Sequence, residues 1–166
     1  MNKLLSLLSI IFLFSMLTGC ASTVQYVPFP DQTKSIENPE MSRIYVVRPT
    51  IFGGGIPMKV RNDDKLIGRT GPKGYLCWER KPGKTQIIGT SENTSVLDVN
   101  LKKGLAYYIQ QHVQMGFIIA RNKLSLLNED EGKLKVSQCK QPILKELKEQ
   151  AKENETSESN EEMDDW

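Results

Sequence analysis

The chain has 166 residues, of which 39% are hydrophobic, and its formal net charge is +2. This length supplies one domain with a real core and excludes an array of several domains. The charge is segregated: residues 20–145 carry 19 Lys and Arg against 11 Asp and Glu, whereas residues 146–166 carry nine acids against two lysines, a pattern typical of a folded domain with a charged tail.

The N-terminus has the pattern of an export signal. Lys3 precedes an apolar run, Leu4 to Leu17, that is too short for a membrane-spanning helix, and small residues then lead to a cysteine in Leu17-Thr18-Gly19-Cys20. This pattern resembles the lipobox of bacterial lipoproteins. The resemblance implies that residues 1–19 are removed and that Cys20 receives a diacylglyceryl group and an N-acyl chain such as palmitate, which together anchor a protein firmly. An ordinary secretory signal that contains a cysteine is the alternative.

Ala21 and Ser22 follow the cysteine, and no Asp stands beside it. In Gram-negative lipoproteins the resemblance then implies transport to the outer membrane rather than retention in the inner membrane. We therefore expect a lipid-anchored protein of the bacterial cell envelope, at the outer membrane and facing the periplasm.

Residues 20–42 contain three prolines, Pro28, Pro30 and Pro39, and no sustained hydrophobic periodicity. This composition predicts a tether that spans at most roughly 70 Å when fully extended. The folded domain is then expected over residues 43–140.

Short β-branched and alternating runs separated by Pro, Gly and Asp turns predict an all-β domain. We expect a mainly antiparallel sandwich or partly open barrel of about seven or eight strands. The strands are expected near residues 43–48, 58–62, 65–69, 75–79, 85–89, 95–101, 106–113 and 124–127.

One or two short helices are expected at the C-terminal end. Asn128 with Glu131 three residues later is a capping pair for a helix that carries Leu134 and Val136. Pro142 suits the first turn of a second helix over residues 141–153. Residues 154–166 are acidic and polar, so they are expected to form a disordered tail.

Turn and strand motifs follow one another in a fixed order over some ninety residues: Arg43–Pro49, Asp63–Gly68, Tyr75–Trp78, Lys81–Lys84, Leu105–Ile109 and Met115–Phe117. This order resembles the small bacterial lipoproteins grouped as domain of unknown function 2846. The resemblance implies a compact β-rich domain behind a lipid anchor, and it brings no catalytic residues. The chain departs from the usual Asp-Gly turn with Asn62-Asp63-Asp64, and its acidic C-terminal extension is long.

The residues that could carry chemistry are few, so we expect no catalytic residues, no metal and no cofactor. His112 is the single histidine, a poor start for a triad or a metal site. Gly53-Gly54-Gly55 lacks the helix and Lys-Ser/Thr of a phosphate loop. Asp63-Asp64 is explained by a turn and Glu129–Glu131 by a helix N-terminus, where negative charge is stabilising.

Cys77 and Cys139 form a candidate disulfide. Three cysteines are present, and the lipid would take Cys20, so an even pair remains in a compartment that can oxidise it. The alternative is two free thiols, one buried and one exposed.

Together these features favour a non-enzymatic envelope lipoprotein that presents a small β-domain to an envelope protein or glycan, with the lipid bilayer as its first partner. Nucleic acid is not expected as a partner, whereas anionic envelope surfaces could attract the basic domain. Two other classes stay open: a small hydrolase acting on peptidoglycan or lipid through an Asp/Glu pair, and an inhibitor or immunity-type lipoprotein that uses the loop Phe52–Pro57 as a plug.

Overall fold

The computed structural model describes residues 21–34 and 36–146. Cys20 and the predicted signal peptide lie outside the described residues, as do the acidic tail and residues 147–153 of the predicted second helix. Within the described part, no helix is long and apolar enough to cross a membrane.

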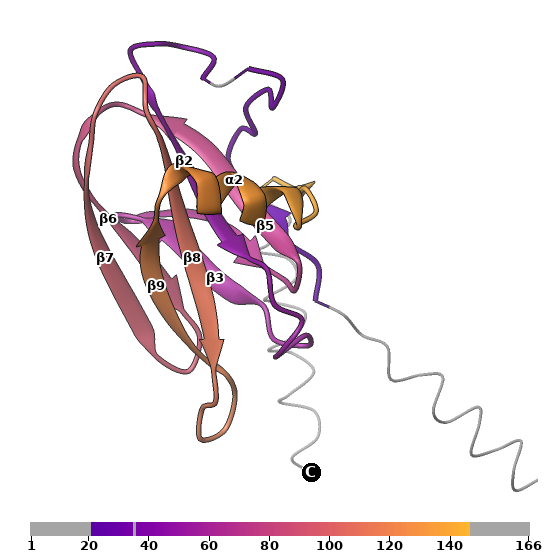
Figure 1. The fold of residues 1–166 in the computed structure, drawn as a ribbon. Helices are drawn as coiled ribbons and strands as arrows, with labels where there is room; N and C mark the ends of the chain where they lie inside the picture. The colour runs from indigo at the N-terminus through magenta and orange to yellow at the C-terminus, as the bar shows by residue number, and fades with distance from the viewer. Residues whose placement is uncertain (1–20, 35, 147–166) are drawn as a thin grey trace, which may run out of the picture.

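Two mixed sheets form the domain, which confirms the predicted all-β sandwich with a short C-terminal helix; the sheets do not close into a barrel (Figure 1). The six-stranded sheet has the order β10 (Ile143–Leu144), β1 (Val24–Gln25), β4 (Lys65–Thr70), β3 (Met58–Asn62), β6 (Gly83–Thr90), β7 (Thr94–Leu101). The four-stranded sheet has the order β5 (Gly74–Arg80), β2 (Ser42–Arg48), β8 (Ala106–Gln114), β9 (Arg121–Leu127). Most neighbours are antiparallel, but β2 pairs with β8 and β1 with β10 in parallel.

The main core lies between the sheets, where alternate residues of each strand face inward. The larger sheet contributes Val60, Ile67, Ile87, Val99 and Leu101, and the smaller sheet contributes Ile44, Val46, Leu76, Trp78, Ile109 and Leu124. On the β7–β9 side the sheets are also joined by hydrogen bonds. The Leu124 amide donates to Ser95 Oγ (3.0 Å), and the Asn122 amide donates to Asn93 Oδ1 (2.8 Å).

The outer face of the smaller sheet is covered by α2 (Glu129–Ser137), which lies across β2 and β8 (Figure 1). The predicted cap is confirmed, because the Glu131 amide donates to Asn128 Oδ1 (2.9 Å). A second apolar cluster lies beneath the helix, and its rings of Tyr45 and Tyr108 stack at 4.9 Å. Gly132 permits this approach, since a Cβ there would lie 2.1 Å from Tyr108 Cγ.

The predicted tether is wrong for residues 21–30, which belong to the domain. Val24 and Gln25 pair with Arg69 and Gly68 of β4. The fully buried Gln25 side chain accepts from the Cys77 amide (2.9 Å) and donates to the Cys77 carbonyl (2.7 Å), so it pairs with the edge of β5 as a strand would.

Three glycines let this N-terminal segment pass so close to the sheet. A Cβ at the three positions would lie 2.3 Å or less from an atom of residues 21–24. These positions are Gly68, Gly71 and Gly74.

The second helix predicted over residues 141–153 is wrong for residues 141–146, which contain a short strand instead. Ile143 and Leu144 form β10, which pairs in parallel with β1. The Ile143 amide donates to the Thr23 carbonyl (2.9 Å), so the hydrogen bonds available at the edge of β1 favour a strand after Pro142.

The predicted disulfide is absent, because Cys77 and Cys139 are free thiols in the structure. Both pack in the cluster beneath α2. However, the bridge between Gly74 and Lys140 places Cys139 beside the start of β5. Cys77 lies three residues beyond Gly74, roughly 10 Å along a strand, whereas a disulfide requires Cα atoms within about 7 Å.

Candidate functional site

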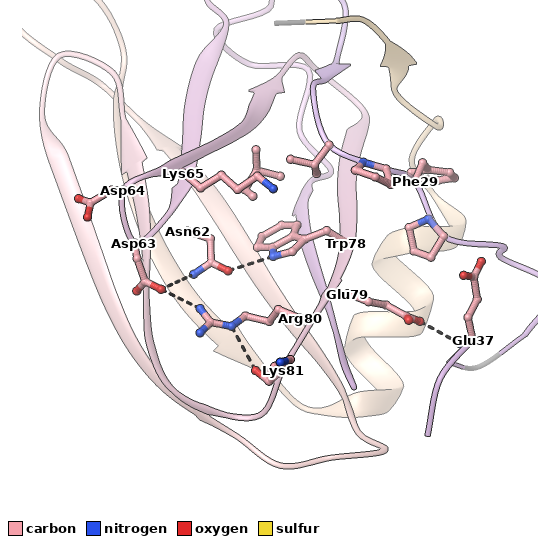
Figure 2. A pocket seen from close by; sticks show the side chains of 14 residues that line it. Phe29, Glu37, Asn62, Asp63, Asp64, Lys65, Trp78, Glu79, Arg80 and Lys81 are labelled. Atoms are coloured by element: carbon pink, nitrogen blue, oxygen red, sulfur yellow. Dashed lines mark hydrogen bonds and ion pairs between the residues drawn. The ribbon is translucent and has the colours of Figure 1, made fainter. Parts of the chain in front are cut away.

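A cleft of about 720 Å³ opens at the β5 side of the sandwich, opposite the side where β7 and β9 are joined. Its walls come from four places in the chain: the N-terminal segment, the β3–β4 turn, the end of β5 and Glu37 (Figure 2). The lining residues are Val27, Pro28, Phe29, Pro30, Glu37, Asn62, Asp63, Asp64, Lys65, Ile67, Trp78, Glu79, Arg80 and Lys81.

The floor of the cleft is apolar and buried. Trp78 is only 4% exposed and belongs to the main core together with Ile67 and Val27. Residues 28–30 form one wall, where two prolines fix the backbone on either side of Phe29. A ligand that enters the cleft therefore meets an apolar base that is part of the packed core.

Asn62 connects the floor to the polar side of the cleft. Its Oδ1 accepts from Trp78 Nε1 (3.1 Å), and its Nδ2 donates to Thr85 Oγ1 and to the Gln86 carbonyl (3.3 Å). Trp78 and Asn62 are both buried, so each supplies the hydrogen bond that the other needs away from water.

Asp63 occupies the first position of the two-residue β3–β4 turn, with a positive φ of 51°. Its carboxylate accepts from the Gln86 amide (2.8 Å), Thr85 Oγ1 (2.9 Å) and Arg80 Nη1 (2.8 Å). These donors, the Gln86 amide first, hold the pKa of the Asp63 carboxyl below its ordinary value. Asp63 is therefore a structural anion of the turn, and Asp64 points away from it in Figure 2.

The Glu79 carboxylate is held by Arg43 and by the Glu37 amide. Its Oε1 accepts from Nε (3.0 Å) and Nη2 (2.8 Å) of the fully buried Arg43 and from the Glu37 amide (2.9 Å). Arg43 also donates to the carbonyls of Asp31 and Lys34, which fixes the loop at the end of the cleft. Both carboxylates nearest the floor thus serve as hydrogen-bond acceptors for the protein itself.

Lys65 and Lys81 bring two exposed ammonium groups to the rim of the cleft. Neither forms an ion pair within residues 21–34 and 36–146. The chemistry offered to a ligand is therefore an apolar base with charges of both signs at its rim, since the exposed carboxylates of Glu37 and Asp64 line the cleft as well.

The backbone of Glu79 adds a hydrogen-bonding edge to the cleft. Every second residue of β5 points its backbone amide and carbonyl away from β2. The Tyr75 amide, which points this way, donates to the Lys140 carbonyl, and the amide and carbonyl of Cys77 form hydrogen bonds with the Gln25 side chain. Glu79 is the next residue in this series, and its backbone amide and carbonyl have no partner among the described residues.

The other residues considered from the sequence lie outside the cleft. His112 lies on β8, where Nε2 contacts Ser125 Oγ (2.7 Å) and Nδ1 contacts Gln110 Nε2 (3.2 Å). Burial lowers its pKa, with Lys135 and Lys123 adding to the effect. Among the described residues, no group of three or more His, Cys, Asp or Glu side chains is arranged to hold a metal.

The carbonyl groups of the glycine loop accept hydrogen bonds from an arginine side chain, so the loop surrounds a guanidinium group rather than an anion. The fully buried Arg48 donates to the carbonyls of Phe52 (3.1 Å), Gly53 (2.7 Å) and Ile56 (2.7 Å). The acidic run at Glu129 lies at the start of α2, where Glu129 pairs with Lys133 (2.7 Å).

Sequence reasoning did not single out Asn62, Trp78, Glu79 or Arg80 as site residues. The available signal was a tryptophan followed by charged residues at the end of a strand, next to the Pro82-Gly83 turn. Their meeting with Asn62 and Asp63 depends on how the two sheets pack, which the local pattern does not contain.

The chain matches no protein-family model. A protein of Haemophilus influenzae described as uncharacterized is 27% identical over 146 residues, which covers 86% of this chain and 87% of the relative. The similarity thus runs through nearly the whole of both chains rather than through one motif.

Proposed function

We propose that the chain is a lipid-anchored, non-enzymatic binding protein of the bacterial envelope, attached to the outer membrane through Cys20, and that its cleft holds an extended segment of another envelope protein. The lipobox-like Leu17–Cys20 pattern supports the anchor. Membership of the lipoproteins grouped as domain of unknown function 2846 is part of the same proposal.

The observation that carries the binding proposal is the open backbone edge of Glu79 beside the apolar floor. An extended polypeptide can add a strand to such an edge, gaining hydrogen bonds from its main chain and specificity from side-chain pockets. Trp78 and Ile67 form the pocket floor, and the rim offers charged groups of both signs, the ammonium groups of Lys65 and Lys81 and the carboxylates of Glu37 and Asp64, to the side chains of the bound segment. A glycan could use the same floor, but it has no regular amide series to match the strand edge.

A photo-crosslinking amino acid at position 81, in the full-length protein in intact envelopes, tests this proposal. We expect one discrete protein adduct from position 81 and none from the matched exposed Lys123 on β9, which lies at the opposite edge of the same sheet. An adduct that glycan-degrading enzymes remove would point to a glycan, and no adduct at position 81 would contradict binding in the cleft.

The anchor is tested separately with labelled palmitate. Incorporation should require Cys20 and disappear in Cys20→Ala. Equal labelling of the variant would contradict the lipoprotein assignment.

A further inference from the structure

We infer that the end of the sandwich formed by residues 49–57 and 115–120 is a membrane-contact surface, which enters the interfacial region of the bilayer that holds the lipid on Cys20. We call this end the apolar tip. The inference rests on the lipid anchor of the proposed function and adds how the domain sits on its membrane.

The apolar tip presents large hydrophobic side chains to solvent. Phe117 is 96% exposed, and Met115 and Ile118 are each 85% exposed. Ile51 and Phe52 are exposed in the neighbouring loop. Clustered exposed apolar side chains of this kind mark contact with a membrane or a partner, whereas single ones need no explanation.

The backbone of the tip is held in place while its side chains point outward. Glu92, in the turn between β6 and β7, accepts from the amides of Phe117 (3.0 Å), Ile118 (2.9 Å) and Ile119 (2.9 Å). Each of these amides is thereby paired before any membrane is present. Inserting the side chains then requires no new partner for these three amides, and unpaired backbone groups are the main obstacle to placing a loop in lipid.

The two loops of the tip touch each other. A Cβ on Gly53 would lie 3.1 Å from Val113 Cγ1 and 3.5 Å from the Cβ of Ala120. Figure 1 shows both loops at the lower end of the sandwich, below the ends of β2 and β8. The exposed side chains therefore form one surface rather than two separate spots.

The chain leaves toward its lipid at this same end, and this identifies the bilayer as the occupant. The Ala21 amide donates to the Gly54 carbonyl (3.0 Å), within the first loop of the tip. Cys20 is one residue away, about 3.8 Å between Cα atoms. A lipid attached there would bring the bilayer surface to the apolar tip without any intervening linker.

Basic residues adjoin the tip. The Lys73 amide donates to the Thr50 carbonyl (3.3 Å), the Lys140 amide donates to the Lys73 carbonyl (2.7 Å), and Arg121 immediately follows the second loop. Cationic side chains next to apolar ones are the combination that favours anionic membrane surfaces.

A fluorescence experiment on the full-length lipidated protein tests this inference. Phe117→Trp and the control Leu105→Trp are reconstituted into phosphatidylethanolamine–phosphatidylglycerol vesicles with or without brominated lipid. Leu105 is also exposed but lies at the other end of β8 from Met115. Trp78 and Trp166 contribute the same background to both proteins.

We expect the emission of Phe117→Trp to shift to the blue and to be quenched by brominated lipid, while Leu105→Trp keeps a water-exposed emission. Equal, unquenched spectra in protein that carries palmitate would overturn the membrane-contact surface and leave the anchor intact. A blue shift that occurs without vesicles and only at high protein concentration would show that the tip binds a second copy of the chain, and it would overturn the inference. A protein without palmitate that also fails to float with vesicles would overturn both the anchor and the contact.

Discussion

The cleft and the apolar tip distribute their hydrogen bonds in opposite ways. In the cleft, side chains are paired with one another, as in Asn62 with Trp78 and Asp63 with Arg80, and the backbone amide and carbonyl of Glu79 have no partner among the described residues. At the tip, Glu92 pairs the backbone amides and the side chains stay open. The two proposed partners follow from the groups left unpaired, because an open strand edge suits a polypeptide and open apolar side chains suit a lipid phase.

The largest effect is expected from breaking the buried pair behind the cleft. Arg43→Ala leaves the Glu79 carboxylate without its cation, which costs about 3–5 kcal/mol of unfolding free energy for a buried pair. Urea denaturation measures this loss. The control is Lys103→Ala, whose exposed pair with Glu40 contributes about 0–1 kcal/mol. Equal losses in the two variants would contradict the view that side-chain pairing holds the cleft.

Asn62→Ala should have the next largest effect. It leaves the buried indole N–H of Trp78 without an acceptor, which costs about 1–3 kcal/mol. The exposed Asn100→Ala is the matched control, with an expected change within about 0.5 kcal/mol. The same urea denaturation reports both, and a neutral Asn62→Ala would mean that the indole finds another partner.

At the tip the expected effect is local and depends on pH. The three amides that donate to Glu92, that of Phe117 first, lower the pKa of its carboxyl below its ordinary value of 4.5. Their contribution to loop order is complete above that ordinary value and is lost as the pH falls through the lower folded value.

Nuclear magnetic resonance can follow this titration at the amides of Phe117, Ile118 and Ile119. We expect their chemical shifts to move together with a midpoint below 4.5 in the native protein, and to lose that transition in Glu92→Gln. A midpoint at or above the ordinary value would show that Glu92 does not hold the loop.

The smallest effect concerns the two thiols, which should react slowly at neutral pH. Burial raises the pKa of Cys77 to about 12 and also raises the pKa of Cys139, which is less buried. At neutral pH, an alkylating reagent should therefore modify Cys139 before Cys77, and both slowly. Mass spectrometry without reductant measures the order of modification. A protein mass two hydrogens below that of the free dithiol would show that Cys77 and Cys139 form the disulfide after all.

Much of the fold was accessible from the sequence because each strand is bounded by its own turn chemistry. The alternation of Leu97, Val99 and Leu101, followed by Lys103-Gly104, suffices to predict β7 and the turn after it. The Asp63-Asp64 turn was found in the same way. These signals are local, so they survive without knowledge of the sheet order.

The N-terminal strand could not be predicted by the same means. Val24 and Gln25 are too few to show a period, and Gln25 stabilises the fold through its side chain against Cys77, fifty-two positions away in the sequence. A signal was nevertheless present: Gly68, Gly71 and Gly74 recur at intervals of three, where another backbone passes.

The cleft was missed for a related reason, since its residues come from segments that only the packing of two sheets brings together. The apolar tip had a clearer signal. Met115 to Ile119 is a strand-ending run without a polar side chain, where a soluble turn would normally carry one.

The hydrogen-bonded path of residues 21–30 has a mechanical consequence. A pull on the chain before Ala21 would load the Ala21–Gly54 bond first and then the residue pairs that join β1 to β4 on one side and to β10 on the other. If β1 peeled away, Gln25 would leave Cys77, and the wall of residues 27–30 would leave the cleft with it. With the proposed anchor at Cys20 and the proposed partner in the cleft, tension on the anchor would therefore act on one wall of the partner's binding site.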